Sequence, residues 1–572
     1  MPLPPPSSYP DIRPSLSDSE SRSNRSNHAY DQTNLSQQRL LGTPRSSPSR
    51  EASPTNTAVQ TLSYNTFSDE NPYTDDLKKD LADKDFDTTV KQHIALSLRG
   101  LLNTSAVLLV LLGLVGVFMA LPITLSVTKN NQERQAAAEK ANNWNSTVPP
   151  TTTIPLIPGG VPVIDSDTPA NARTKTSLNG ETWKLVFSDE FNKPGRTFYP
   201  GEDPFWEAAD LHYWATNDLE WYTPDAVTTA GGNLVITLSQ RELHNLDFAS
   251  GMLQSWNKLC FTGGLIEVNV SLPGPPDVGG FWPGAWTMGN LGRPGYGATT
   301  DGVWPYSYSS CDAGVTKNQS MPNGFSYLPG QKLNSCVKSG DHPSIGIGRG
   351  APEIDILEVA SADDNFGGDV GSVSQSGQFA PFDYALTPNS KYIYLSNTSN
   401  GDNGKTIMNG YKGGNSQQAV SALTALDPEI YDGQKYQTFA FEYIPSDTSG
   451  EQSYVRWLVN GKETWRFLEP AVGPNPKSKV GQRLISKEPM SVVLNLGISN
   501  NWGNVNMKKL PFPARYYVDY VRIYQHPDRV SLDCDPADYP TSDYIKMHYN
   551  AYTNPNLTTW SQAGYSFPTF SL

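Results

Sequence analysis

The feature that most constrains the fold is a series of short apolar runs between residues 183 and 524. Each run is five to eight residues long, is rich in β-branched and aromatic residues, and is separated from the next by turn-forming residues. Several runs alternate apolar with polar residues, and no sustained helical period occurs among them. The runs are 183–187, 233–238, 264–270, 438–443, 454–459, 491–496 and 517–524. This pattern predicts an all-β protein with two antiparallel sheets packed as a jelly roll.

A further apolar run carries three carboxylates. Residues 353–358 have the sequence Glu-Ile-Asp-Ile-Leu-Glu. Side chains alternate between the faces of a strand, so Glu353 and Asp355 share a face, and one β-bulge after Asp355 would bring Glu358 to that face as well. Retaining glycosidases use two carboxyls about 5–5.5 Å apart, and crowding raises one pKa to supply a general acid. A solvated acidic edge strand and a calcium site are the alternatives.

An apolar run without charged residues limits how the chain is placed in the cell. Residues 101–127 would form a helix of about 40 Å, which is long enough to cross a membrane. The run lies too far from Met1 for a cleaved signal peptide, although a buried soluble helix is an alternative. Lys78 and Lys79, together with the cysteines and most glycosylation sequons downstream, favour a cytoplasmic N-terminus. We expect a single-pass type II membrane protein of the secretory pathway, with its large domain lumenal or extracellular.

Composition divides the rest of the chain into regions. Residues 1–97 contain few large apolar residues and are predicted to be a disordered cytoplasmic tail. Residues 128–180 form a Pro- and Thr-rich stalk, residues 181–527 hold the predicted jelly roll, and residues 528–572 form a C-terminal extension. The net charge of −14 argues against nucleic acid as a partner. The absence of alternating strands and helices argues against a nucleotide-sugar transferase.

Several motifs resemble those of known carbohydrate-active proteins. The segments 188–191, 280–289, 353–358 and 518–524 occur in the order seen in glycoside hydrolase family 16. More narrowly, the chain resembles the fungal β-glucan synthesis-associated proteins, the killer-toxin-resistance proteins of β-1,6-glucan assembly. The segments that carry this narrower resemblance are 304–312, 486–502 and 534–541. The resemblance runs from about residue 183 to residue 570 and implies a concanavalin-like jelly-roll sandwich.

The resemblance also implies a role for each acid. Glu353 would be the nucleophile and Glu358 the acid/base, while Asp355 would hydrogen-bond Glu353 and set its protonation. Attack by water would make the protein a hydrolase, and attack by a sugar hydroxyl would make it a transglycosylase. The implied function is a membrane-anchored glycosidase or transglycosylase in fungal β-1,6-glucan biosynthesis. A glucan-binding scaffold for wall assembly, with little or no turnover, is the alternative.

One departure from family 16 concerns the strand after the acids. Many members carry a histidine there, but residues 371–379 contain none. We expect Gln375 to offer a hydrogen bond in its place, so that the acid/base is tuned differently. This departure puts ordinary endoglucanase activity in doubt.

Aromatic and amide side chains are expected to line the sugar site, because sugar rings stack on flat side chains. Trp286 matches the family's cleft position best, and filling of the core is the alternative for each tryptophan. The candidates are Trp282, Trp286, Trp304, Asn495 and Trp502. The expected partners are a β-glucan oligosaccharide or polysaccharide, the lipid bilayer and other wall-synthesis proteins.

Four cysteines permit three disulfide connectivities. We prefer Cys311–Cys336, which closes an insertion between Met288 and Glu353 beside the acids. Cys260–Cys534 would then tie the C-terminal extension to the sandwich. The closed insertion is expected to narrow the cleft.

Further sites are predicted with less detail. The glycosylation candidates are Asn145, Asn269, Asn318, Asn397 and Asn556. No cofactor is expected to be required, and no metal site is predicted. Glu190 and Asp519 resemble positions near a structural calcium in some relatives, but hydrogen-bonded carboxylates at the edge of the core are the favoured explanation.

Overall fold

The computed structural model describes residues 162–306, 308–316, 330–384, 386–396, 405–412, 417–446 and 452–570. The chain divides into two units, residues 43–155 and the remainder, and every described residue belongs to the second. The predicted tail, the span at 101–127 and most of the stalk lie outside the described residues. So do Asn145, Asn318 and Asn397. Within the described residues, no helix has the length and apolar character that crossing a membrane requires.

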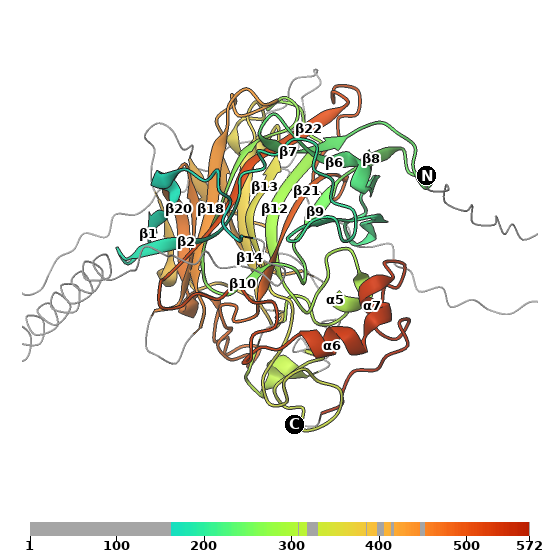
Figure 1. The fold of residues 1–572 in the computed structure, drawn as a ribbon. Coiled ribbons are helices and arrows are strands. Elements are labelled where there is room, and N and C mark those ends of the chain that lie inside the picture. The colour runs from blue at the N-terminus through green and yellow to red at the C-terminus, as the bar shows by residue number, and fades with distance from the viewer. Residues whose placement is uncertain are drawn as a thin grey trace, which may run out of the picture. The chain divides into compact units, whose positions relative to one another are not determined.

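Two large antiparallel sheets make up most of the described structure (Figure 1). In spatial order, the first sheet contains β1 (Thr174–Thr176), β2 (Thr182–Asp189), β22 (Ala514–Gln525), β11 (Gly264–Ser271), β18 (Gln437–Ile444), β19 (Tyr454–Val459), β20 (Lys462–Leu468) and β15 (Ile393–Leu395). Two more strands, β7 (Asn233–Leu238) and β6 (Val227–Ala230), extend from β22.

The second sheet carries the predicted acids. Its spatial order is β16 (Thr406–Met408), β17 (Ala419–Ala425), β14 (Ser372–Gln378), β13 (Glu353–Ala360), β12 (Phe281–Gly289), β21 (Met490–Ile498), β9 (Met252–Gln254) and β3 (Glu207–Ala208), with β10 (Cys260–Phe261) also paired to β21. A small third sheet contains β4 (Leu211–His212), β5 (Glu220–Tyr222) and β8 (Phe248–Ser250). All seven runs predicted as strands are strands, and the predicted all-β, jelly-roll-like fold is confirmed.

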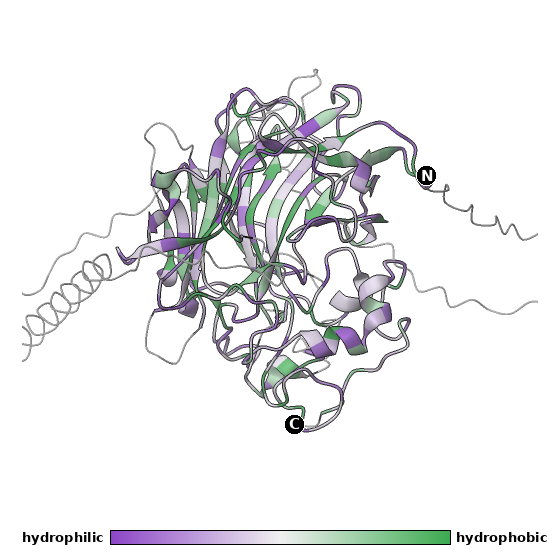
Figure 2. Ribbon diagram, in the orientation of Figure 1, coloured by the Kyte–Doolittle hydropathy of each residue, from purple (hydrophilic) through white to green (hydrophobic). Residues whose placement is uncertain are grey.

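The core lies between the two large sheets. Ile354, Ile356 and Leu357 of β13 are fully buried there, in the same cluster as Phe439 and Phe441 of β18. Burial of each such side chain stabilises the fold by roughly 1.5–3 kcal/mol. Hydrophobic and hydrophilic residues alternate along several strands in Figure 2, as expected for strands with only one buried face.

The sandwich begins earlier than the sequence predicted. β1 pairs with β2, and Ile164 forms a bridge to Ser188. The hydroxyl of Thr168 donates to Glu190 Oε1 over 2.8 Å. Residues 162–180 therefore pack on the domain, and their assignment to the stalk was wrong. β1 has the sequence Thr-Lys-Thr, which lacks the apolar alternation that marks the other strands.

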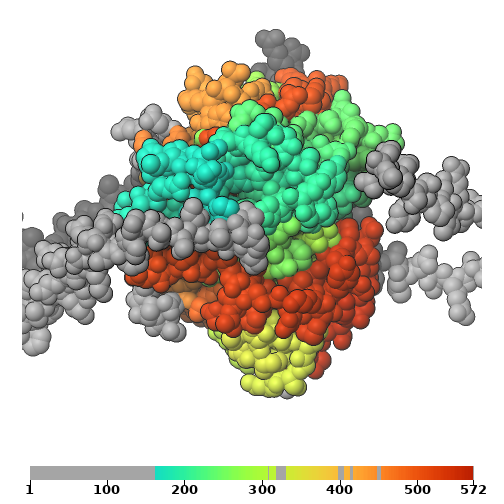
Figure 3. All heavy atoms as spheres, in the orientation of Figure 1, coloured from blue at the N-terminus to red at the C-terminus, as the bar shows by residue number. Residues whose placement is uncertain are grey.

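The C-terminal extension is folded against the insertion that precedes the acids. Its helices α6 (Ser542–Met547) and α7 (Tyr549–Thr553) lie near α5 (Gly297–Thr300) of the insertion (Figure 1). Figure 3 shows the extension, in red, packed beside the insertion, in yellow. One apolar cluster joins the two segments; it includes Leu291, Ala298, Val303, Leu333, Tyr544, Tyr552 and Trp560.

A buried ion pair and two disulfides fasten the extension and the insertion. The guanidinium of Arg349 donates to both carboxylate oxygens of Glu488 at 2.8 Å, and both side chains have 0% exposure. Arg349 also donates to the backbone carbonyls of Tyr539 and Pro540 in the extension. The structure contains both preferred disulfides, Cys260–Cys534 and Cys311–Cys336.

Candidate active site

A bulge in β13 places the three acids on one face. Along β14, Asp355 lies opposite Ser376, and the next paired residue, Glu358, lies opposite Ser374. The pairing with β12 shifts at the same point. Ile356 and Leu357 both point into the core because of this extra residue, and Glu358 joins Glu353 and Asp355 on the opposite face. The predicted bulge is confirmed.

Indole N–H groups orient the two glutamates. Trp304 Nε1 donates to Glu353 Oε2 over 2.9 Å, and Trp282 Nε1 donates to Glu358 Oε1 over 3.0 Å. The amide of Gln378 donates to the second oxygen of Glu353. Both glutamates are partly exposed, so solvent reaches them although their carboxylates are held in place.

Asp355 is held differently from the two glutamates. Its side chain is 1% exposed, and one of its oxygens accepts a hydrogen bond from the hydroxyl of Ser376, which lies directly across the strand pair. Its backbone oxygen accepts from Trp457 Nε1 over 2.8 Å. The expected hydrogen bond between Asp355 and Glu353 stays a prediction.

Burial shifts the acids toward their protonated forms. It raises the pKa of Glu353 to about 8, with a further contribution from the charge of Glu358, and it raises the pKa of Glu358 to about 7. Burial also raises the pKa of Asp355 well above its usual range, and the two glutamate charges add to the effect. At neutral pH the three groups therefore cannot all be ionised.

Hydrogen bonding and burial favour different positions for the proton that Glu353 and Glu358 share. Burial raises the pKa of Glu353 more, but Glu353 accepts two N–H donors and Glu358 accepts one. Each donor stabilises the ionised form of the carboxylate that it contacts. We give more weight to these contacts, because they act on defined oxygens whatever fills the site. These contacts favour Glu358 as the carboxyl that keeps the proton when a glucan fills the site.

The predicted sugar-binding residues surround the acids. Trp282 stacks on Trp502, with ring centroids 4.6 Å apart and 5° between the planes. Trp502 Nε1 donates to Val359 O over 2.9 Å, which fixes that ring beside β13. Trp286 Nε1 donates to Asn495 Oδ1 over 2.9 Å. All five candidates thus lie on or beside the face that bears the acids, and their binding of sugar stays a prediction.

Four residues that the sequence analysis did not single out contribute to the site. Ser376 and Gln378 contact Asp355 and Glu353 directly. The negative charges of the acids contribute to a raised pKa of Tyr213, after burial, and the charge of Glu358 does the same at Tyr411. Ser and Gln at alternate positions of 372–378 are a signal that could have identified Ser376 and Gln378.

Gln375 does not face the acids, so the prediction for this residue was wrong. It is fully buried, and its amide donates to Ile356 O over 3.0 Å, at the bulge. Its own oxygen accepts from the Thr464 hydroxyl over 2.7 Å. Gln375 therefore supports the bulge from the core side, while its neighbours contact the acids.

The remaining predicted sites lie away from the acids. Glu190 forms an ion pair with Arg522, with Nη2 to Oε2 at 2.7 Å, and Asp519 accepts from Asn269 Nδ2 over 2.9 Å. These contacts agree with hydrogen-bonded edge carboxylates, and within the described ranges no group of three metal-ligating side chains was found. Asn269 is partly buried in β11, whereas Asn556 is exposed, so Asn556 is the more accessible glycosylation candidate.

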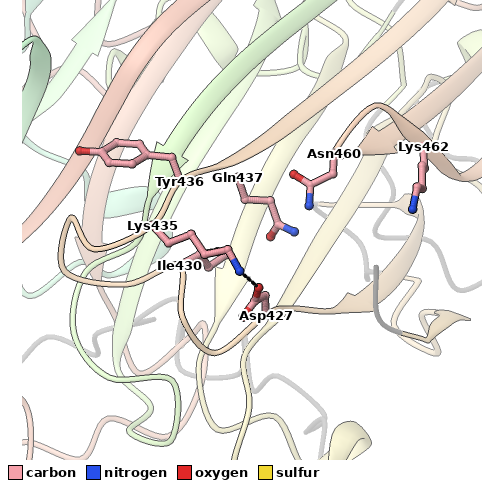
Figure 4. A pocket seen from close by; sticks show the side chains of 7 residues that line it. All are labelled: Asp427, Ile430, Lys435, Tyr436, Gln437, Asn460 and Lys462. Atoms are coloured by element: carbon pink, nitrogen blue, oxygen red, sulfur yellow. Dashed lines mark hydrogen bonds and ion pairs between the residues drawn. The ribbon is translucent and has the colours of Figure 1, made fainter. Parts of the chain in front are cut away.

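A pocket of about 300 Å³ lies on the first sheet, away from the acids. It is lined by Asp427, Ile430, Lys435, Tyr436, Gln437, Asn460 and Lys462 (Figure 4). Lys435 reaches Asp427, while Tyr436 points away from them. None of the acids of β13 borders this pocket, and we assign it no function.

Comparison with solved structures finds glucanases. The laminarinase catalytic domain from Thermotoga maritima is 18% identical and covers 60% of this chain and 98% of its own, with a TM-score of 0.36. The endo-β-1,3-glucanase from Pyrococcus furiosus is 17% identical and covers 63% of this chain and 98% of its own, with a TM-score of 0.37. At these scores the likeness carries no argument about function.

Comparison with curated sequences gives closer relatives. The β-glucan synthesis-associated protein KRE6 of Saccharomyces cerevisiae is 53% identical over 411 residues, which are 71% of this chain and 55% of that protein. The protein SKN1 of Candida albicans is 51% identical over 415 residues, 72% of this chain and 54% of its own. The chain therefore spans about half the length of these relatives. The model of the β-glucan synthesis-associated protein family SKN1/KRE6/Sbg1 matches residues 64–572, and the chain belongs to that family.

Proposed function

We propose that the protein is a retaining glycosidase or transglycosylase that acts on β-glucan during fungal cell-wall β-1,6-glucan biosynthesis. The observation that carries this proposal is the bulge in β13, which puts Glu353 and Glu358 on one face. Each glutamate is oriented there by an indole N–H group. Membership in a family named for β-glucan synthesis supports the substrate class.

The two glutamates divide the first half of the reaction between them. The carboxylate of Glu353 attacks the anomeric carbon while the glycosidic C–O bond breaks, and Glu358 gives its proton to the leaving oxygen. The product is a glycosyl ester on Glu353 and a free glucan end. The hydrogen bonds from Trp304 and Gln378 favour the ionised form of Glu353 that this attack requires, against the effect of burial.

The second half of the reaction decides between hydrolysis and transfer. Water or a sugar hydroxyl attacks the anomeric carbon, its proton passes to Glu358, and the ester bond to Glu353 breaks. Asp355, buried and hydrogen-bonded by Ser376, lies between the two glutamates along the strand. Burial and the two glutamate charges raise its pKa, which favours its neutral form and limits the charge that it adds to the crowded pair.

The proposal includes a membrane anchor and a side of the membrane for the domain. We place residues 101–127 across a membrane of the secretory pathway, with the jelly roll on the lumenal or extracellular side. The two disulfides support this side, because disulfides persist in oxidising compartments. The chemistry written above uses side chains of this chain alone and calls for no cofactor.

The test uses the full chain, purified in detergent, with Glu353→Gln as its matched variant. Both proteins are incubated with defined β-1,3- and β-1,6-gluco-oligosaccharides, and product masses are followed. Longer or shorter products that disappear in the variant are expected, and their lengths separate transfer from hydrolysis. Saturable glucan binding by both proteins without turnover in either would overturn the proposal in favour of a binding scaffold.

A further inference from the structure

The face of the second sheet that bears the acids extends on both sides of β13. β14, β17 and β16 follow β13 in one direction, and β12, β21, β9 and β3 follow it in the other. The two edge strands, β16 and β3, both carry partly exposed residues, and the inner strands beside them, β17 and β9, are largely buried. What differs between the two directions is the segment that covers the face.

A cap covers the sheet on the side of β21 and β9; we define it as residues 209–222. Leu211 and Tyr222 of the cap form a buried cluster with Val493 of β21 and Met252 of β9. Backbone hydrogen bonds join the cap to the sheet, from Ala209 N to Met252 O at 2.8 Å and from Leu219 N to Ile498 O at 2.9 Å. The cap therefore occupies the surface over which a glucan would otherwise continue.

Polar contacts fix the cap to the wall of the acid site. Asn495 accepts from Trp286 Nε1 over 2.9 Å and donates to Tyr222 Oη over 3.1 Å. Tyr222 in turn donates to Asp218 over 3.1 Å. Glu220, with 0% exposure, accepts from Ile498 N over 3.1 Å. A segment tied down at so many buried points behaves as a fixed wall and not as a mobile flap.

The insertion closes the cap from its outer side. Tyr296 of the insertion belongs to the same buried cluster as Leu211 and Tyr222. A Cβ placed on Gly297 would lie 2.5 Å from the ring of Trp214 in the cap and 3.1 Å from Thr558 Cα in the C-terminal extension. Three separate parts of the chain thus meet with no room for another side chain between them.

Tyr213 lies where the cap meets the acids. Its ring packs edge-on against Tyr222, with ring centroids 6.4 Å apart, and it packs with Trp286 against the buried cluster. The charges of Glu353, Glu358 and Asp355 all act on its hydroxyl. Tyr213 is therefore the cap residue best placed to stop a sugar chain at the acids.

The opposite direction offers smaller side chains. Ser374 and Ser376 of β14 lie opposite the acids, and Ser376 lies opposite Ser421 of β17. Their hydroxyl groups can form hydrogen bonds with a sugar, unlike the apolar cluster beneath the cap, although the three side chains are only 6%, 4% and 3% exposed. The cap therefore blocks the direction over β21 and β9, whereas β14 and β17 carry short polar side chains beside the acids.

We infer that the site acts at the end of a glucan chain, with the cap as the wall against which the terminal sugars rest. This inference rests on the proposed function and names its substrate: the terminus of a linear glucan rather than its interior. Tyr213 is the residue that sets this specificity.

The test compares a linear β-glucan oligosaccharide with a cyclic β-glucan of similar size and linkage, which has no end. The full chain in detergent is expected to convert the linear glucan by hydrolysis or transfer. Its rate of conversion of the cyclic glucan is expected to be at least 100-fold lower. Equal rates on both glucans would overturn the inference but would leave the proposed function standing. Failure on the linear glucan would overturn the proposed function and, with it, the inference.

Variants of Tyr213 test whether this residue sets the preference for linear over cyclic glucans. Tyr213→Ala is expected to narrow the gap between the linear and cyclic rates at least tenfold, because it removes the wall beside the acids. Tyr213→Phe keeps the ring and is expected to keep the gap. If both variants discriminate as the parent does, the role of Tyr213 is wrong. If Tyr213→Ala does not fold, Tyr222→Phe, which breaks the tie to Asn495, should narrow the gap in its place.

Discussion

At the scale of single residues, the two glutamates differ in the groups that hold them. Glu353 accepts hydrogen bonds through both of its carboxylate oxygens, and Glu358 accepts one through a single oxygen. A carboxylate with two donors is prepared to attack, whereas one with a single donor more readily exchanges a proton. Substitution of Glu353 and substitution of Glu358 should therefore impair different steps of the reaction.

Replacement of the acid/base tests this division of roles. Glu358→Gln should lower turnover of natural glucans by about 10²–10⁴-fold, the usual contribution of general acid catalysis. A dinitrophenyl glucan has a leaving group that needs no proton. Glu358→Gln should therefore lower the rate of the first half of the reaction much less with this substrate. Glu353→Gln should lose both activities. The release of dinitrophenolate by the two variants is the measurement, and an equal loss on both substrates in Glu358→Gln would contradict the assignment.

The pH profile should report the shared proton. The pair works when it holds one proton, and burial raises the pKa of Glu358 to about 7 and that of Glu353 to about 8. Below this interval both carboxyls are protonated and neither can act as the nucleophile, and above it both are ionised and neither can act as the acid. We expect a bell-shaped dependence of kcat/KM with a maximum between pH 7 and 8, measured on one oligosaccharide. A maximum near pH 5 would contradict the effect of burial.

At the scale of elements, the bulge in β13 is what converts a strand into a site. The sequence predicted it, because three acids among aliphatic residues can share one face only if a residue is inserted. What supports it could not be predicted. Gln375 and Ser376 are adjacent and both polar, and only the register of β14 against β13 decides that Ser376 faces the acids while Gln375 enters the core.

Removal of the support under the bulge should cost both stability and activity. Gln375→Leu leaves Ile356 O and the Thr464 hydroxyl without this partner in the core, which costs roughly 1–3 kcal/mol. Thermal unfolding and turnover of the variant are the measurements. Ser374→Ala, on the same strand, serves as the matched control and should lose less stability, because it leaves the hydrogen bonds of Gln375 to Ile356 and Thr464 in place. An equal loss of stability in both variants would show that Gln375 does not support the bulge.

At the scale of the whole described domain, the two sheets could be predicted and the layer around them could not. Seven strands carried enough apolar alternation to be recognised. The cap contains strands of two and three residues, and the C-terminal extension contains helices of five and six residues. Segments this short have no period to detect, and their structure depends on what they pack against.

The buried pair of Arg349 and Glu488 holds this outer layer together. Arg349→Met leaves a buried carboxylate unpaired and should lower the free energy of unfolding by about 3–5 kcal/mol. Residues 535–570 should then become sensitive to protease, because the variant also loses the contacts to Tyr539 and Pro540. The double variant Arg349→Met with Glu488→Leu should recover much of the loss. Resistance of the single variant to protease would show that the apolar cluster alone suffices.

The packing of the C-terminal extension on the insertion has a consequence for synthesis. Cys260 is translated 274 residues before Cys534, and Tyr544, Tyr552 and Trp560 reach Leu291 and Val303 only after every strand between them has been made. Until residue 560 has been translated, the packing that supports the insertion beside the acids is incomplete. A chain released before that point would have the acids but not the full enclosure around them.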